Sequence, residues 1–391
     1  MGVSFLYFGK IPQLNGAAVF FNSLIEKKEY FQKYLMVEVR FFCQRTSNAR
    51  AVSPKKVEKR RIFLKELLNF FLPRTLMGCV LHFYIFLQRN AKRVVNQYLS
   101  EVQAGGEEIL VFNDIFVGVE CLKHKQVNFT RSILILHNDG NPLQMIIEGL
   151  PKLKKYKKLK KDVEMLIASV SRVVLLSKGA KDNFIKIFPD AINKAIVINN
   201  GVELPETVSA NPFDIPHDRL FGISVGTISC RKGHDLLIRA MQNLDATQKQ
   251  KITIFCLGNI GDDVNLSNCP KNLIFLAGVE HTQLSAYLKN VDFFIMCSRN
   301  EGVPLSILEA MQYSLPIFST NVGGIPDIVN SNGILFNPTE PDIRNTLQKI
   351  IAGEYNFGEM AQQSVNLYNE YYSLDVMIKK YVSVIKEIEY E

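Results

Sequence analysis

The chain has 391 residues, of which 47% are hydrophobic and 21% are charged. This length exceeds one ordinary hydrophobic core, so we expect two domains, and the composition excludes a disordered chain. The seven cysteines show no C-x-x-C spacing, which favours a reduced, cytosolic protein, and no apolar run reaches the roughly 18 residues needed to span a membrane.

The net charge of +8 is divided unevenly along the chain. Residues 1–200 contain 32 Lys and Arg against 16 Asp and Glu, whereas residues 201–391 contain 14 against 22, so the halves carry +16 and −8. We expect the basic half to contact an anionic membrane through Lys152–Lys161 and the region Lys55–Arg93. A solvated basic helix is the alternative, and no recognition motif indicates nucleic acid.

The first half reads as a series of strands. Val3–Phe8 is apolar and has no basic leader, so it predicts a first strand and not a signal peptide. Further strands are expected over 109–112, 132–136, 172–176 and 195–198. His137 directly follows the expected strand 132–136, at its carboxyl end.

The second half follows a proline-containing linker at Pro205, Pro212 and Pro216. Strands and helices then alternate at short spacing, which is typical of βαβ units and a doubly wound parallel sheet. The expected strands are 220–225, 252–257, 273–276, 291–296 and 316–319, with helices from His234 and near 283–289 and a last helix in 368–390.

Two carboxylates, Glu301 and Glu309, surround the turn after strand 291–296, and Pro304 marks an early helix position. Ligands bind outside the carboxyl ends of parallel strands, where helix N–H groups accept an anion. Carboxylates accept hydrogen bonds from hydroxyls, and the backbone N–H groups within 302–305 suit a phosphate. The stretch therefore favours binding of a nucleotide-sugar. Two glutamates that are only exposed to solvent at a helix would give the same sequence pattern.

Two other strand-to-helix turns carry residues of the same kind. Gly226–Gly233 contains Lys232, which could reach a phosphate as a point charge. Asn321–Asp327 contains the pair Gly323-Gly324, which permits close backbone approach, followed by Pro326 at an expected helix start.

In this order and spacing the three turns closely resemble the nucleotide-binding half of the retaining glycosyltransferases of the GT-B fold, family 4 (glycosyl transferases group 1). The matching residues are Lys232-Gly233, Glu301-Gly-Val-Pro-Leu305 with Glu309-Ala-Met311, and Gly323-Gly-Ile-Pro-Asp327, and the resemblance covers roughly 195–340.

The resemblance implies an α/β architecture of two Rossmann-like doubly wound domains that face each other across a cleft. A basic, acceptor-binding domain would occupy 1–203, and a nucleotide-sugar-binding domain 204–370. The remaining residues, 371–391, would form a helix that packs back on the first domain.

The resemblance also implies roles for single residues. Lys232 would bind the diphosphate, Glu309 the ribose hydroxyls, Glu301 the transferred sugar, and the backbone around Gly278-Val279 the base. In the first half, Asn15-Gly16 would lie beside the donor phosphates and His137 near the reacting centre. The catalytic set is then His137, Glu301 and Lys232, and the donor-binding set is Gly16, Thr227, Lys232, Val279, Glu301, Gly302, Val303, Pro304, Leu305, Glu309, Gly323 and Gly324.

The chain departs from the family pattern at two places. The family often has an Arg two residues after the glycine at position 226, where this chain has Ile228, preceded by Thr227. Asn15-Gly16 replaces a double glycine, which Asn tolerates because it accepts positive φ. The lost cation motivates the alternative of a non-catalytic GT-B partner subunit. A sugar-nucleotide epimerase of the same fold is a further alternative.

No metal or cofactor is predicted. Asp262-Asp263 lies in a Gly- and Asn-rich loop without a third ligand. His82, His124, His217, His234 and His281 show no ligand spacing, so we assign them no role.

The reaction that the resemblance implies is transfer of a hexosyl or N-acetylhexosaminyl group, with retention, from a nucleoside diphosphate sugar to a hydroxyl of a glycan, lipid-linked or protein-linked acceptor. We favour a UDP-sugar, and the content of Lys, Asn, Ile and Phe suits bacterial surface polysaccharide or glycoconjugate synthesis. Such an enzyme would work in the cytoplasm, at the inner face of the membrane.

Overall fold

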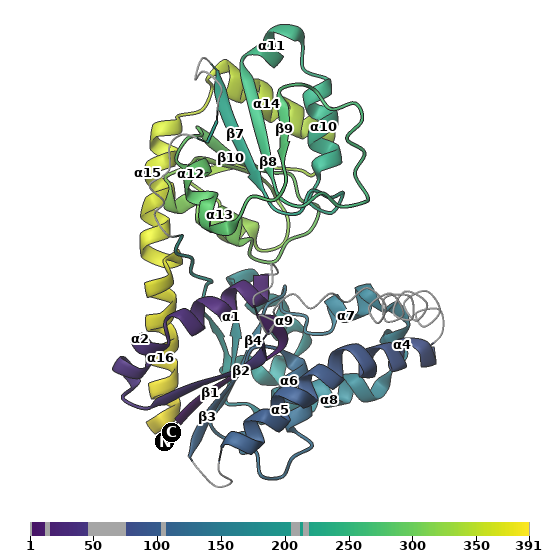
Figure 1. Ribbon diagram of the computed structural model, residues 1–391, viewed down its shortest axis with the longest axis vertical. Helices are drawn as coiled ribbons and strands as arrows, with labels where there is room; N and C mark the ends of the chain where they lie inside the picture. The colour runs from purple at the N-terminus through teal and green to yellow at the C-terminus, as the bar shows by residue number, and fades with distance from the viewer. Residues whose placement is uncertain are drawn as a thin grey trace, which may run out of the picture. The chain divides into compact units, whose positions relative to one another are not determined.

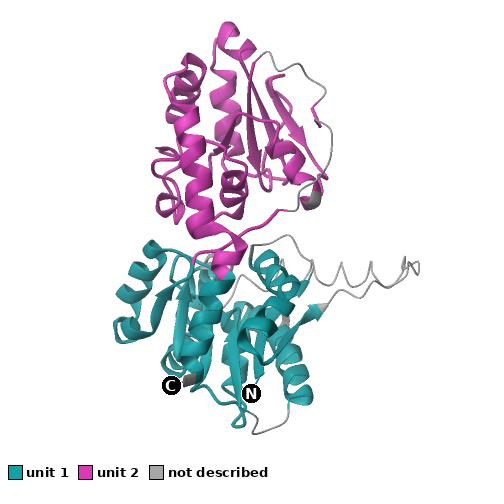
Figure 2. Ribbon diagram, turned by 90° about the vertical axis from the view of Figure 1, so that its left-hand side faces the viewer, with its two compact units in different colours: residues 1–198, 378–391 teal, residues 199–377 magenta. Residues whose placement is uncertain are grey.

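The computed structural model describes residues 2–11, 16–45, 76–102, 107–204, 212–213 and 219–390. The chain forms two compact units, which Figure 2 shows in different colours. Unit 1 contains residues 1–198 and 378–391, and unit 2 contains residues 199–377. Of the expected linker, Pro205 and Pro216 lie outside the described residues.

Unit 1 is built on a sheet of six described strands, in the order β2-β1-β3-β4-β5-β6, and every neighbouring pair is parallel. The order reverses between β1 and β3, so the sheet is doubly wound. The strands are β1 (Gly2–Ile11), β2 (Glu38–Arg45), β3 (Glu108–Phe112), β4 (Ser132–Leu136), β5 (Arg172–Leu175) and β6 (Ala195–Val197).

Helices cover both faces of this sheet (Figure 1). They are α1 (Gly16–Glu26), α2 (Lys28–Leu35), α4 (Leu76–His82), the π-helix η2 (Phe83–Gln88), α5 (Arg89–Glu101), α6 (Ile115–Cys121), α7 (Gln144–Gly149), the 3₁₀ helix η3 (Pro151–Lys155), α8 (Lys157–Ser169), α9 (Lys178–Ile187) and the 3₁₀ helix η4 (Pro189–Lys194).

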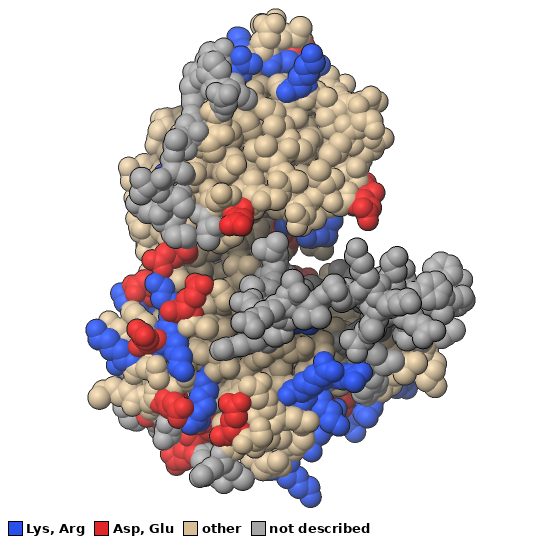
Figure 3. All heavy atoms as spheres, viewed as in Figure 1, with Lys and Arg blue, Asp and Glu red and all other residues tan. Residues whose placement is uncertain are grey.

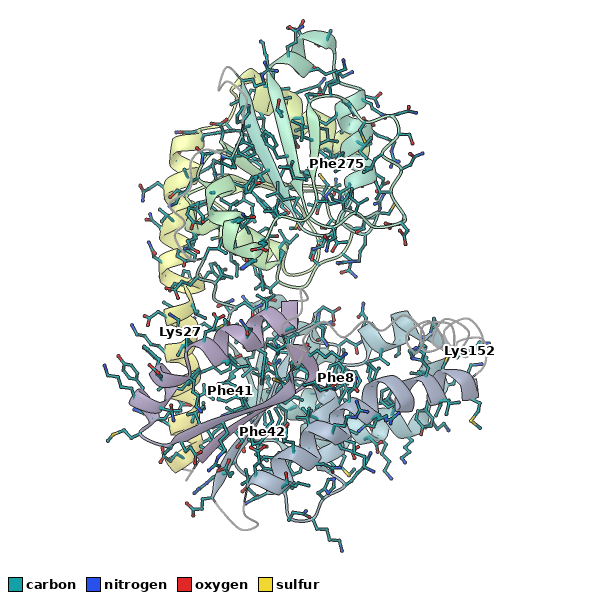
Figure 4. The ribbon with its side chains drawn as sticks, viewed as in Figure 1. Phe8, Lys27, Phe41, Phe42, Lys152 and Phe275 are labelled. Atoms are coloured by element: carbon teal, nitrogen blue, oxygen red, sulfur yellow. The ribbon has the colours of Figure 1, made fainter. Side chains whose placement is uncertain are left out.

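The two faces of β2 explain how both layers are held. Successive strand side chains point to opposite faces, and Phe41 and Phe42 do so (labelled in Figure 4). Phe41 packs against Phe21 of α1, with ring centroids 5.7 Å apart, whereas Phe42 packs against Tyr98 of α5 at 5.5 Å. The apolar strands therefore bind one helical layer on each side.

Unit 2 repeats this architecture. Its strands lie in the order β12-β11-β10-β7-β8-β9, again with parallel neighbours, and the order reverses between β7 and β10. The strands are β7 (Leu220–Val225), β8 (Ile252–Leu257), β9 (Leu273–Leu276), β10 (Phe293–Met296), β11 (Ile317–Thr320) and β12 (Gly333–Phe336).

Helices again form two layers in unit 2. The elements are α10 (His234–Gln242), α11 (Ala246–Gln250), the 3₁₀ helix η5 (His281–Gln283), α12 (Leu284–Leu288), α13 (Leu305–Gln312), the 3₁₀ helix η6 (Ile325–Asp327), α14 (Glu340–Ala352), α15 (Phe357–Leu367) and the π-helix η7 (Tyr368–Tyr372). Alternating residues of β10 reach both layers: Phe293 and Ile295 join the core beneath α10 and α14, and Phe294 and Met296 join the core beneath α13.

The last helix, α16, runs over Leu374–Tyr390 and passes from unit 2 into unit 1. Its residue Tyr381 is fully buried in unit 1 and lies near Phe20 of α1, with ring centroids 6.0 Å apart. The unit boundaries fall after Ile198 and Met377.

The predicted α/β class with two doubly wound sheets is confirmed. The strands β1, β3, β4, β5 and β6 lie where the apolar runs predicted them, as do β7 to β11. Two strands were not predicted: β2, which mixes charged and aromatic residues, and β12, which is short and half-buried. Among the described residues, no helix combines the length and apolarity needed to cross a membrane.

Two buried tyrosines provide a test of how hydrogen bonding of a buried hydroxyl affects stability. The hydroxyl of Tyr381 is buried and has no hydrogen-bond partner among the described residues, whereas that of Tyr368 donates to the carbonyl of Val202 at 2.9 Å. An unpaired buried polar group costs about 1–3 kcal/mol, and a paired hydroxyl contributes about 1 kcal/mol. We expect Tyr381→Phe to raise the free energy of unfolding and Tyr368→Phe to lower it, as measured by urea denaturation. Equal losses in both variants would contradict this.

Candidate functional site

Three loops meet at the carboxyl edge of the sheet in unit 2. They follow the neighbouring strands β7, β10 and β11 and cover residues 226–233, 297–304 and 321–324. The chain leaves β7 and β10 toward opposite faces because the strand order reverses between them, and this reversal opens a crevice in such sheets. The sequence-predicted donor turns are these three loops.

An ion pair connects the first two loops. Lys232 Nζ lies 2.6 Å from Glu301 Oε1, and the same oxygen accepts a hydrogen bond from Ser298 Oγ at 2.7 Å. The Glu301 side chain is only 7% exposed and that of Lys232 only 16%. The structure therefore joins two residues for which the sequence predicted separate ligand contacts.

Arg231 is a second cation near this pair. Its Nη1 lies 3.9 Å from Glu301 Oε1 and donates to the Asn300 carbonyl at 3.2 Å. Ile228, which stands where the family often has an Arg, is fully buried and bridges to Ile260. Arg231 was not predicted from the sequence, because a cation was expected at position 228, two residues after Gly226. The fold of the loop brings Arg231 near Glu301 instead. Thr227 is exposed in the same loop.

A second ion pair joins the loop 297–304 to the start of α10, directly after the first loop. Arg299 donates to both carboxylate oxygens of Asp235 at 2.6 and 2.8 Å, and its backbone N–H donates to the Arg231 carbonyl at 2.9 Å. Although burial raises the pKa of Asp235, its hydrogen bonds with Arg299 and Arg239 hold that pKa below the usual value. These contacts of Arg299 thus fix the position of Lys232 relative to Glu301.

Glycines let the three loops approach this closely. Gly323 has φ +55°, and a Cβ at this position would lie 1.7 Å from the carbonyl oxygen of Glu301. Gly324 N–H donates to the Gly302 carbonyl at 3.0 Å. Gly233 has φ +71°, and its Cβ would lie 1.8 Å from the Cys297 carbonyl oxygen. The pattern Gly323-Gly324 therefore serves a loop-to-loop contact in the structure.

Glu309 lies on α13, whose N-cap is Pro304. The first N–H groups of a helix have no partner within the helix, so those after Pro304 suit an anion. The carboxylate of Glu309 is almost buried, and Oε1 lies 2.8 Å from His281 Nε2. No spacing in the sequence pointed to His281, since it comes from a separate loop.

Other predicted donor residues line the neighbouring loops. Gly278 has φ +75° with open space at its Cβ position, and Val279 is half-buried against the core of unit 2. Val303 and Leu305 are also half-buried against that core. Their backbones lie at the carboxyl edge of the sheet, and donor binding by these residues stays a prediction.

Two predicted residues belong to unit 1. Gly16 is the first residue of α1, while its neighbour Asn15 lies outside the described residues. His137 follows β4, and its Nε2 lies 2.9 Å from Asn113 Oδ1. Burial lowers the pKa of His137 to about 4, so the ring is neutral near pH 7. Since Oδ1 accepts, Nε2 carries the hydrogen and Nδ1 is an acceptor.

Asn113 and Asp114 were missed from the sequence. They follow β3, the neighbour of β4, and so reach the same sheet edge as His137. Asp114 caps α6 by accepting from Phe116 and Val117 N–H groups and also accepts from Phe8 N–H. Burial raises the pKa of Asp114 to about 7, although these N–H groups oppose the shift. The sequence signal that could have identified Asn113 and Asp114 is their position directly after the buried strand β3.

The described residues hold no group of three His, Cys, Asp or Glu side chains that could bind a metal ion. Asp263, half of the Asp-Asp pair in the sequence, accepts a hydrogen bond from the Cys230 N–H at 2.9 Å.

The contact of Gly323 with Glu301 yields a prediction on stability. Ala at a left-handed position costs roughly 1–2 kcal/mol. Gly353→Ala meets this cost alone, because φ is +72° and no atom lies within 4 Å of the new Cβ. Gly323→Ala must also move the Glu301 backbone, so we expect its unfolding free energy to fall by roughly 3 kcal/mol or more, measured by urea denaturation. Equal losses in the two variants would contradict the loop contact.

Sequence comparison matches residues 207–365 to the family model described as glycosyl transferases group 1. Among curated relatives, the O-antigen biosynthesis glycosyltransferase WclY of Escherichia coli is 25% identical over 230 residues, which are 56% of this chain and 62% of WclY. The chain spans about half to three-fifths of the length of the first curated relatives it matches.

Solved structures match over almost the whole chain. Anabaena HepE in complex with UDP has a TM-score of 0.64 at 16% identity and covers 99% of this chain and 100% of its own. Sucrose-phosphate synthase from Thermosynechococcus elongatus has a TM-score of 0.70 at 14% identity and covers 99% and 98%. The chain therefore has the two-domain GT-B fold of glycosyltransferases, and its C-terminal half matches the model of glycosyl transferases group 1.

Proposed function

We propose that this protein transfers a hexosyl or N-acetylhexosaminyl group from a nucleoside diphosphate sugar to a hydroxyl of a glycan, lipid-linked or protein-linked acceptor, with retention. The donor is a UDP-sugar, and the product belongs to a surface polysaccharide or glycoconjugate. The name of WclY, which refers to O-antigen biosynthesis, and the UDP complex of HepE support these finer assignments.

The ion pair between Lys232 and Glu301 is the observation that carries the proposal. Two almost buried charges lie 2.6 Å apart at the carboxyl edge of the sheet, and each is a partner for a different part of a donor. A diphosphate carries more charge than one carboxylate and so competes for Lys232. The exchange would free Glu301 to accept hydrogen bonds from sugar hydroxyls.

The difficult step in such a transfer is departure of the diphosphate while the anomeric carbon becomes cationic. Lys232, Arg231 and the N–H groups at the start of α13 would stabilise the negative charge that develops on the leaving group. Preorganised donors of this kind are typically worth a few kcal/mol each. We do not assign Glu301 as a covalent nucleophile, because a glycosidase-like mechanism needs two carboxylates that flank one bond.

Arg231 favours an active enzyme over a non-catalytic partner subunit. The alternative was motivated by a missing phosphate-binding cation, and Arg231 lies close enough to Glu301 to supply that charge. Arg231 and Lys232 would supply the positive charge that a metal supplies elsewhere, so we propose a metal-independent reaction.

Donor turnover tests the proposal. Incubation with UDP-, GDP- and ADP-sugars should give hydrolysis of a UDP-sugar in the presence of EDTA. Glu309→Ala should weaken donor binding by roughly 10- to 100-fold, since hydrogen bonds to charged groups contribute about 1.5–3 kcal/mol. Glu301→Ala should lower kcat more than it changes KM.

Glu354→Ala, which removes an exposed glutamate of the same unit, serves as the control and should behave as the wild type. Unchanged kinetics in both site variants would overturn the residue assignment. Absence of binding to every nucleotide would instead favour the partner-subunit reading.

We also propose that unit 1 contacts the anionic inner face of a membrane. Seven lysines of η3 and α8 are exposed, and Figure 3 shows Lys and Arg gathered over α5 and α8. Lys152 is labelled in Figure 4. The lysines are Lys152, Lys154, Lys155, Lys157, Lys158, Lys160 and Lys161.

The apolar residues between these lysines are not part of the contact surface. Leu153 and Leu159 are buried in the core of unit 1. Exposed apolar side chains come instead from α4, which packs against η3 and presents Met77 at 76% and Leu81 at 45% exposure. In the region Lys55–Arg93, residues 55–75 lie outside the described part of the chain.

Vesicle sedimentation at physiological salt checks the membrane contact. The wild type should sediment with anionic vesicles and not with phosphatidylcholine vesicles. Replacing Lys157, Lys158 and Lys161 by Gln should lower the partition coefficient at least tenfold, because each basic residue near anionic lipid contributes about 1 kcal/mol. The matched triple replacement of Lys251, Lys271 and Lys289 in unit 2 should have no effect. Equal sedimentation of the wild type with both vesicle types would contradict the proposed membrane contact.

A further inference from the structure

The carboxylate of Glu309 has one hydrogen-bond partner within the described part of the chain, the imidazole of His281. Nε2 lies 2.8 Å from Oε1, the carboxylate side chain is 7% exposed, and the imidazole is 45% exposed. A carboxylate only accepts hydrogen bonds, so Nε2 is the donor. The contact occupies Oε1 and leaves Oε2 as a second acceptor.

The loop that carries His281 is held in a defined conformation. His281 opens η5, and Glu280 and Gln283 close this turn as a capping box. Gln283 N–H donates to the Glu280 carbonyl at 2.9 Å. Two reciprocal contacts of this kind satisfy the free N–H groups at a helix start, so the imidazole is presented to Glu309 from a fixed backbone.

The same loop contains Gly278 and Val279, which stand between β9 and His281. Under the proposed function this backbone holds the base of the donor, and Glu309 holds the ribose hydroxyls. The hydrogen bond from His281 therefore connects the segment assigned to the base with the carboxylate assigned to the ribose.

We propose that His281 is a positioning residue for the donor nucleoside. Its Nε2–H fixes Oε1 of Glu309, so that Oε2 is directed at the ribose hydroxyls. This role rests on the proposed function. Gln at this position keeps an N–H donor at a similar reach, whereas Ala removes it and lets the carboxylate rotate.

Calorimetric titration with UDP and with 2′,3′-dideoxy-UDP tests the role. His281→Ala should raise the Kd for UDP about tenfold, and His281→Gln should stay within about twofold of the wild type. The dideoxy ligand has no hydroxyl for Glu309, so its Kd should be the same in the wild type and in His281→Ala. In a Glu309→Gln background, adding His281→Ala should cause no further loss.

The outcomes separate this role from the proposed function. A wild-type chain that binds UDP while His281→Ala binds it equally well would overturn the role of His281 alone. An equal loss for UDP and the dideoxy ligand would also overturn it, since it would mean that the whole loop was disturbed. A wild-type chain that binds no UDP would overturn both the donor assignment and the role of His281.

Discussion

The buried ion pair of Lys232 and Glu301 is the constraint on which the candidate site depends. Burying two charges is costly, and removing one partner leaves the other uncompensated. The ion pair of Asp235 with Arg299 joins the loop of Glu301 to the start of α10, directly after the loop of Lys232. Gly323 also lets a third loop approach the Glu301 backbone closely. Loop positions, and not only residue types, therefore determine what the site can bind.

The sheet topology places these loops together. The order of strands in unit 2 reverses between β7 and β10, so their loops meet at one edge while the helices diverge to opposite faces. Unit 1 has the same kind of reversal, and His137 and Asn113 stand at the corresponding carboxyl edge. Each unit thus presents polar side chains at the edge that its fold leaves open, and the two edges have different chemistry: charged in unit 2 and neutral at His137.

Sequence reasoning located most of the strands because parallel strands, buried on both faces, read as continuous apolar runs. It also predicted the three strand-to-helix loops that meet at the edge of the sheet in unit 2, since glycine and proline mark such turns. It missed β2, where Glu38 and Arg40 interrupt the apolar pattern. It could not find the partners Arg231 and His281, because side-chain contacts between separate loops depend on tertiary packing that no spacing in the sequence records.

A crystal structure of the protein with UDP is the most direct measurement of the central claim, that the crevice in unit 2 binds a nucleoside diphosphate. We expect the diphosphate on Lys232 with the Lys232–Glu301 distance lengthened beyond ion-pair contact, and the ribose hydroxyls on Glu309 beside His281. UDP bound away from the β7 and β10 loops, or bound there with Lys232 still paired to Glu301, would contradict the account.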